Sequence, residues 1–166
     1  FICRRRSVRR YQLRPVADAM VSDLLQAGMA APSARACDPW HFVILADDAL
    51  RADLASKLPN GPFLADAPTA IVVCGDLQKA NAQSESFLLV DCAAATQNIL
   101  LAATALGLGA CWLGIHPRPE RIALLRQALN LPESIIPVAI ITLGWPAEDH
   151  EPRTRVQSAR IHRNTF

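Results

Sequence analysis

A cluster of arginines lies near the start of the sequence. Five of the seven residues from 4 to 10 are arginine, and Ser7 and Val8 separate them into two groups. Guanidinium groups bind phosphate through paired hydrogen bonds, and a serine hydroxyl between them adds a donor. A second basic pair, Arg153 and Arg155, lies near the other end of the sequence. This pattern predicts one anionic ligand held between the two ends of the folded chain; the alternative is a solvated basic arm.

The overall charge argues against a general polyanion-binding protein. The 166 residues carry a formal net charge of +2, and 51% of them are hydrophobic while 19% are charged. Nucleic-acid domains usually carry a wider basic stripe with interleaved aromatic residues. We therefore expect one compact domain over residues 1–166 and no nucleic-acid partner.

The remaining polar residues show no catalytic or metal-binding arrangement. The five cysteines form no CxxC pair, the four histidines form no HExxH motif, and no GxSxG turn is present. Gly107 and Gly109 follow a predicted helix instead of opening one, which excludes a dinucleotide fingerprint. An anion site without an evident acid, base or nucleophile suggests that a bound cofactor carries the chemistry, and no metal is expected. Scattered cysteines and no visible signal peptide predict a reducing, cytoplasmic location.

Alternating helices and strands must position these residues. Hydrophobic periodicity predicts a single α+β or α/β domain. The expected helices cover residues 15–30, 47–58, 87–108 and 119–130, with Asp47 as a helix cap. The expected strands cover residues 41–46, 69–75, 110–115 and 137–143.

The apolar segment from Phe87 to Leu108 is long enough to be compared with a membrane span. It contains Asp91 and several other polar residues, whose transfer into lipid costs several kcal/mol. A helix buried on nearly all sides explains the segment better, so no membrane partner is expected. Such a helix forms the core of a domain, a dimer interface, or both.

Two further segments are informative. Small residues in the loop from Ala31 to Trp40 let a flat ligand approach the backbone, although an ordinary helix-to-strand connection has the same composition. The polar C-terminal extension 147–166 contains four arginines and is expected to be either disordered or wrapped over a partner subunit.

Taken together and in order, the motifs resemble those of the FMN-dependent nitroreductase family. Residues 5–11 resemble its RRSxRxF opening, and residues 31–42 its APSAxNxQPWxF segment. Residues 91–114 resemble its central helix and next strand, and residues 143–155 its closing LGYP and basic pair. The resemblance spans essentially the whole chain. It implies an α+β fold, a three-layer α/β/α sandwich with a mixed, mainly antiparallel sheet and a long central buried helix.

The resemblance also implies residues that bind FMN. Arg5 and Ser7 would hold its phosphate, and Arg153 or Arg155 would close on it from the C-terminal side. Arg9 would lie near the pyrimidine edge of the flavin, where a cation stabilises the anionic reduced ring.

Other implied contacts involve backbone and a second subunit. Gly114 would bring backbone close to flavin N5, while Pro32 and Ser33 would reach FMN from the other subunit of an intertwined homodimer. The complete implied set is Arg5, Arg6, Ser7, Arg9, Pro32, Ser33, Ala34, Ala36, Asp38, Leu113, Gly114, Arg153 and Arg155.

Two residues depart from the family pattern. Ala36 and Asp38 stand where the family usually has Asn and Gln. A carboxylate at Asp38 would oppose the anionic reduced flavin and lower its potential, unless Asp38 pairs with Arg35 instead.

The implied activity is an FMN-dependent oxidoreductase that transfers reducing equivalents from NADH or NADPH to a small acceptor, such as a nitroaromatic or a quinone. The segment 59–86, where the family usually carries its lid, is short and predicts an open pocket. Two alternatives stay open: other flavin chemistry on the same fold, namely flavin breakdown or reductive dehalogenation, and a non-catalytic flavin-binding protein.

Overall fold

Eight helices and strands alternate along the chain, and the computed structural model describes residues 2–166. The helices are α1 (Asp18–Met29), α2 (Asp48–Lys57), α3 (Glu85–Ala105) and α4 (Pro119–Leu129). The strands are β1 (Trp40–Leu45), β2 (Thr69–Asp76), β3 (Gly109–Gly114) and β4 (Ile135–Gly144). Each predicted element is present, and its boundaries lie within three residues of the expected ones.

The four strands form one sheet in the order β1-β2-β4-β3, and every neighbouring pair is antiparallel. A single parallel bridge joins Ser7 to Ala110 on the outer edge of β3. The four-stranded sheet is therefore wholly antiparallel, and the mixed character that was expected is limited to this isolated bridge outside it. Strand β3 is an edge strand, and the N-terminal segment covers only part of its edge.

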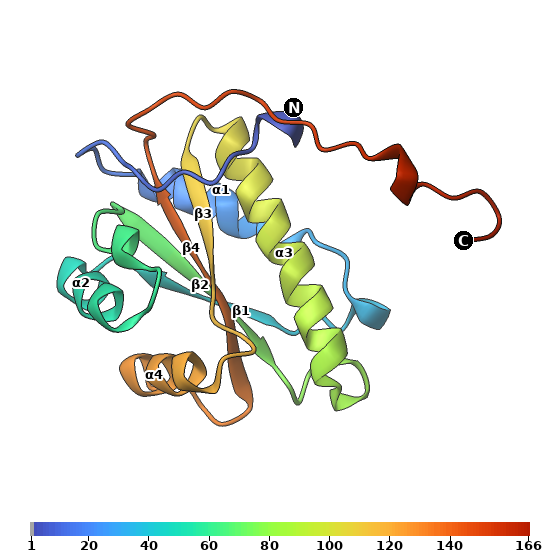
Figure 1. Cartoon of the computed structure of the whole chain (residues 1–166). Helices are drawn as coiled ribbons and strands as arrows, with labels where there is room; N and C mark the ends of the chain where they lie inside the picture. Colours follow the sequence, from blue (N-terminus) through green and yellow to red (C-terminus); the bar gives the residue numbers. More distant parts are fainter. Residues whose placement is uncertain (1) are drawn as a thin grey trace.

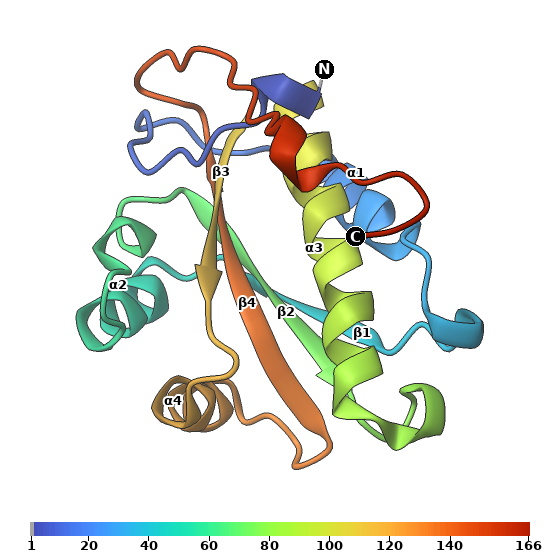
Figure 2. The same cartoon turned by 45° about the vertical axis from the view of Figure 1, so that its right-hand side comes forward.

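Helices cover both faces of the sheet (Figures 1 and 2). Helices α1 and α3 pack with the sheet around one hydrophobic core, which includes Leu24 and Ile99. Helices α2 and α4 enclose a second core on the opposite face, which includes Leu54 and Leu125. Every residue of β2 is buried, because the strand lies inside the sheet and helices cover both faces. This burial accounts for its nearly continuous run of apolar residues. The predicted three-layer sandwich is confirmed.

Helix α3 is the central helix of the fold. By length and composition alone it could cross a membrane, but it contacts all four strands and α1, as a core helix does. Asp91 and Ile99 lie on its buried face. One stripe stays exposed in the single chain, where Phe87 is 44% and Val90 is 67% exposed.

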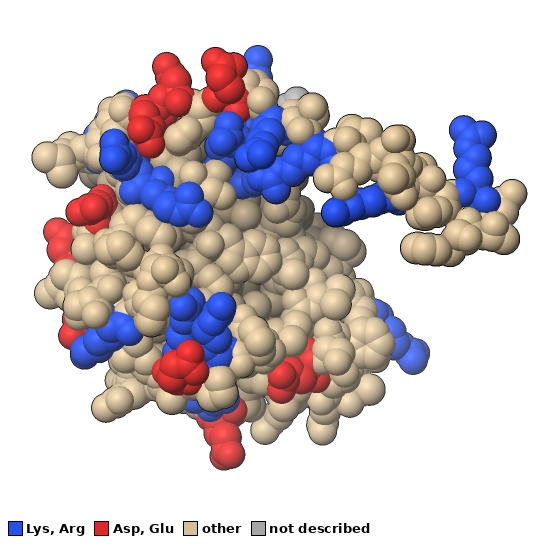
Figure 3. Space-filling model, viewed as in Figure 1, with Lys and Arg blue, Asp and Glu red and all other residues tan. Residues whose placement is uncertain are grey.

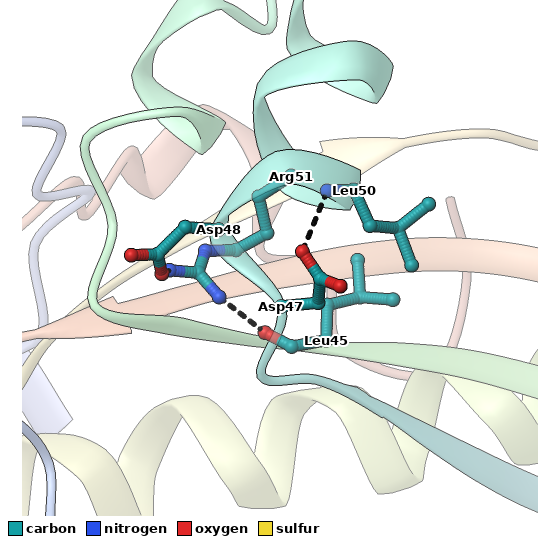
Figure 4. Close-up of polar contacts among 5 residues, drawn as sticks. All are labelled: Leu45, Asp47, Asp48, Leu50 and Arg51. Carbon is teal, nitrogen blue, oxygen red and sulfur yellow. Dashed lines mark hydrogen bonds and ion pairs between the residues drawn. The ribbon is translucent and has the colours of Figure 1, made fainter.

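Helix α2 begins with a side-chain cap, as predicted. Asp47 Oδ1 accepts a hydrogen bond from the backbone N–H of Leu50 at 3.1 Å (Figure 4). Arg51, one turn further on, is 2% exposed; it donates to the carbonyl of Leu45 at 2.8 Å and forms an ion pair with Asp48. A carboxylate thus neutralises this buried guanidinium.

The C-terminal segment extends away from the body of the molecule (Figure 1). All residues from 151 to 166 are exposed, and their one regular element is the short 3-10 turn Ser158–Arg160. The apolar side chains of Val156 and Ile161 are therefore exposed, and they pack against no core of the same chain.

Candidate functional site

The N-terminal segment lies along the outer edge of β3. The backbone N–H of Val8 donates to the carbonyl of Ala110 at 3.0 Å, beside the Ser7–Ala110 bridge. A Cβ on Gly109 would come within 2.6 Å of the Val8 side chain, so only glycine allows this close approach. Tyr11 fastens the segment further, because its hydroxyl donates to the carbonyl of Val8 at 2.7 Å.

Alternate residues of this segment converge on one side of β3. Arg5, Ser7 and Arg9 all influence the thiol of Cys111. Burial raises the pKa of that thiol, while the charges of Arg9 and Arg5 and the hydroxyl of Ser7 act in the opposite direction. The guanidinium of Arg9 also lies 5.6 Å from the ring centre of Phe63, in cation–π contact.

The two ends of the chain meet, as the arginine pattern predicted. The backbone N–H of Arg153 donates to the carbonyl of Cys3 at 3.0 Å, and the guanidinium of Arg6 donates to the carbonyl of Glu151. Between them is a cavity of about 410 Å³. It is lined by Ile2, Cys3, Arg5, Arg6, Arg153, Thr154, Arg155 and Val156.

This cavity is suited to an anion. Four of its lining residues are arginines, and no carboxylate from the described residues 2–166 lines it or pairs with them. Figure 3 shows Lys and Arg side chains gathered above a hollow in this face. Since guanidinium groups bind phosphate in bidentate fashion, the cavity has the chemistry of a phosphate site.

The free part of the β3 edge begins just beyond the N-terminal segment. In an antiparallel strand the backbone groups of successive residues point to opposite sides, so Trp112 and Gly114 face away from β4, as Ala110 does. A Cβ placed on Gly114 would meet no atom within 4 Å. The backbone at Gly114 is therefore open to a flat ligand, whereas the side chain of Leu113 is buried in the core.

Arg121 lies behind this open edge and was missed at the sequence level. Its Nη1 donates to the carbonyl of Gly114 at 2.7 Å, and its Nη2 donates to the carbonyl of Pro59 at 2.9 Å. One signal could have found it: Arg121 lies four residues before the buried Leu125, so it is a charged residue on the inward face of α4.

The loop before β1 is held by internal hydrogen bonds. The hydroxyl of Ser33 donates to the carboxylate of Asp38 at 2.5 Å and accepts from the backbone N–H of Asp38 at 2.9 Å. The predicted alternative, a pair between Asp38 and Arg35, is not the contact that forms. The φ angles of Arg35, Ala36 and Asp38 are 55°, 53° and 47°, in the left-handed region that non-glycine residues rarely adopt.

Asp91 connects this loop to the core. It is buried on α3, and its Oδ1 accepts a hydrogen bond from the backbone N–H of Ala34 at 2.9 Å. Pro32, Ser33 and Ala34 are thereby fixed at the start of the loop, but on the far side of the molecule from the arginines. The loop leads into β1 and the arginines adjoin β3, which are opposite edges of the sheet (Figures 1 and 2).

A larger cavity, of about 840 Å³, lies between residues 10–15, α2 and the segment 65–68. Arg10, Arg14 and Arg51 line it together with the carboxylates of Asp48 and Asp66. Because these charges largely compensate one another, it is less suited to an anion than the arginine-lined cavity.

Comparison with known proteins identifies the family of this chain. The sequence profile of the nitroreductase family matches residues 2–58 and 52–145. A protein of Archaeoglobus fulgidus, provisionally named NADH dehydrogenase/NAD(P)H nitroreductase, is 40% identical over 165 residues, covering 98% of this chain and 94% of the relative.

Solved structures give the same result. A protein of Parabacteroides distasonis with the same provisional name superposes with a TM-score of 0.94 at 41% identity, covering 99% of this chain and 96% of that one. A provisionally named nitroreductase of Desulfovibrio desulfuricans, solved in complex with FMN, gives a TM-score of 0.86 at 35% identity, covering 99% and 95%. Since the family profile covers most of the sequence and the relatives share both its sequence and its fold, the chain belongs to the nitroreductase family.

Proposed function

We propose that this protein is an FMN-dependent oxidoreductase that takes reducing equivalents from NADH or NADPH and passes them to a small acceptor, such as a nitroaromatic or a quinone. The observation that carries the proposal is the arginine-lined cavity beside an open strand edge. FMN combines a phosphate with a flat ring system, and the two features match these two parts of the site. The NAD(P)H in the names of relatives and the FMN bound to a structural neighbour support the same assignment.

The residues divide into a phosphate group and a ring group. Arg5, Arg6, Arg153 and Arg155 would hold the phosphate, since all four line the unneutralised cavity. The hydroxyl of Ser7, on the same side of the segment as Arg5, would add a donor.

At the ring, Arg9 and the backbone of Gly114 would provide the contacts. Arg9 is held over Phe63, so its charge is fixed near β3. When bound, FMN would accept a hydride from the nicotinamide and deliver electrons to the acceptor, which is why the protein needs no side-chain nucleophile. The protein's own part is to bind, to orient and to supply positive charge near the ring.

A second copy of the chain would complete the site. The loop with Pro32, Ser33, Ala34, Ala36 and Asp38 lies at the opposite edge of the sheet from the arginines, so one chain does not bring them together. A homodimer that packs the exposed stripe of α3 against its copy would also cover Phe87 and Val90. The exposed extension 147–166 would lie over the partner subunit. Because Asp38 already accepts from Ser33, this loop would approach FMN mainly through its backbone.

The proposal is tested by FMN titration and by reduction. We expect the purified protein to bind FMN, to be bleached by NADH or NADPH under nitrogen, and to regain its colour with a nitroaromatic or a quinone. Arg5→Ala and Arg153→Ala should each weaken FMN binding about 10- to 100-fold, because each loses charge-assisted hydrogen bonds worth about 1.5–3 kcal/mol. Arg4→Ala is the matched control, since Arg4 adjoins Arg5 but does not line the cavity.

Three results would contradict the proposal. They are a colourless protein that takes up no added FMN, bound FMN that neither nicotinamide nucleotide reduces, and equal effects of Arg4→Ala and Arg5→Ala. Consumption of FMN itself would instead favour flavin breakdown.

A further inference from the structure

Arg121 is a buried cation that joins two walls of the proposed FMN site. It is 6% exposed, and its two terminal nitrogens donate to the carbonyls of Gly114 and Pro59. Gly114 is the open end of the β3 edge, and Pro59 begins the turn that leads to Phe63 under Arg9. A single guanidinium therefore fixes the spacing between the strand and the turn.

The charge of Arg121 is not neutralised by the protein. Within residues 2–166, no Asp or Glu oxygen lies within 4 Å of its guanidinium, and its Nε has no hydrogen-bond partner. Burying an unpaired cation is unfavourable. Arg51 differs in its charge partner alone: it is also buried, it also donates to a backbone carbonyl and its Nε also has no partner, yet Asp48 pairs with it (Figure 4). The fold thus has a neutralised buried arginine on α2 and an unneutralised one on α4.

The hydrogen bond to Gly114 changes what the strand edge offers to a ligand. A free edge presents both N–H donors and C=O acceptors. Arg121 occupies the carbonyl of Gly114, so the N–H group is left as the free backbone group at this residue. A ligand at this point meets a donor, with a positive charge one hydrogen bond behind it. It is this positive charge, and not the N–H donor, that favours an electron-rich, negatively charged ring over a neutral one.

Resting on the proposed FMN site, we infer that Arg121 is a positioning residue that makes the β3 edge electropositive and so strengthens binding of reduced FMN relative to oxidised FMN. It acts through the backbone of Gly114 and the turn at Pro59, without a direct contact to the ring. The alternative is that Arg121 is purely structural: it would link the strand to the turn, and its charge would not affect the flavin.

The test measures the midpoint potential of the bound flavin by reduction against a reference dye, together with the dissociation constant of oxidised FMN. Arg121→Gln keeps a hydrogen-bond donor and loses the charge, while Arg121→Lys keeps the charge; Arg121→Met removes both. In the Gln and Met variants we expect the preference for reduced FMN to fall about tenfold, which for a two-electron couple is about 30 mV. Arg121→Lys should retain most of the wild-type potential.

Arg51→Met is the matched control, since it removes a buried arginine on the same face of the sheet outside the site. It should lower the free energy of unfolding without moving the potential. The inference is overturned if Arg121→Gln has the wild-type potential, or if the Gln and Lys variants shift it equally; this comparison stands even where Arg121→Met does not fold. A wild-type protein that binds no FMN would contradict the proposed function itself, whereas one with normal FMN binding and an unchanged Arg121→Gln potential would contradict only this inference.

Discussion

Ala36 occupies a backbone conformation that its side chain does not favour. Its φ of 53° lies in the left-handed region, where an ordinary L-residue costs about 1–2 kcal/mol and asparagine is better tolerated. We expect Ala36→Asn to raise the free energy of unfolding by about 0.5–1 kcal/mol, as measured by urea denaturation. Ala30→Asn is the control, because the φ of Ala30 is −81° and no strain is relieved there. Equal effects at both positions would show that backbone strain is not the cause.

Single residues were predictable where the chemistry was local. The arginine clusters could be read directly, and their convergence follows from the observed contacts of Arg153 with Cys3 and of Arg6 with Glu151. Partners set by loop geometry could not be read: Asp38 pairs with Ser33 because the backbone turns back on itself there. The partners of Arg121 depend on the folded geometry in the same way, since one acceptor, the carbonyl of Pro59, is 62 residues away in the sequence.

At the scale of elements, the exposed stripe of α3 is the surface with the clearest consequence. Val90 is 67% exposed on an otherwise apolar helix, and a buried charge at a dimer interface is strongly unfavourable. For the proposed homodimer, we expect Val90→Glu to shift the protein from dimer to monomer in analytical ultracentrifugation and to weaken FMN binding at least tenfold, because the loop that the second copy would contribute is lost. Ile44→Glu, at an exposed apolar residue of β1, should leave both properties unchanged. A wild-type monomer that binds FMN normally would refute the shared site.

The elements themselves were predictable because each carries a strong local pattern. Asp47 and Pro119 mark helix starts, and the apolar run of β2 indicates a strand covered on both faces. The order β1-β2-β4-β3 could not be derived from periodicity, because strand pairing depends on contacts distant in sequence. The three-layer arrangement could be predicted only from the family resemblance. The exposed side of α3 was also not evident, since apolar residues surround the helix on all sides.

For the whole molecule, buried thiols predict a loss of stability in alkali. Burial raises the pKa of Cys74 and of Cys92 from the ordinary value of 9 to about 12, so the folded chain binds these protons more tightly than the unfolded chain. Their stabilising contribution is complete below pH 9 and is lost as the pH rises toward 12. Each thiol should lower the free energy of unfolding by up to about 1.4 kcal/mol per pH unit within that window.

Urea unfolding between about pH 8 and about pH 10.5 measures this slope. Cys92→Ala should flatten the slope, whereas Cys3→Ala should not, because Cys3 is exposed. Parallel slopes for the wild type and Cys92→Ala would rule out the buried thiols as the cause.

The meeting of residues 2–6 with residues 153–156 also sets an order of events during biosynthesis. The two walls of the proposed phosphate site come from segments that are separated in the sequence by all four strands of the sheet. Residues 153–156 follow β4 in the sequence, so during synthesis this second wall leaves the ribosome after all four strands and helices α1 to α4. We therefore expect an incomplete chain that ends before Arg153 to lack one wall of the proposed FMN site, and so to leave the flavin pool of the cell untouched.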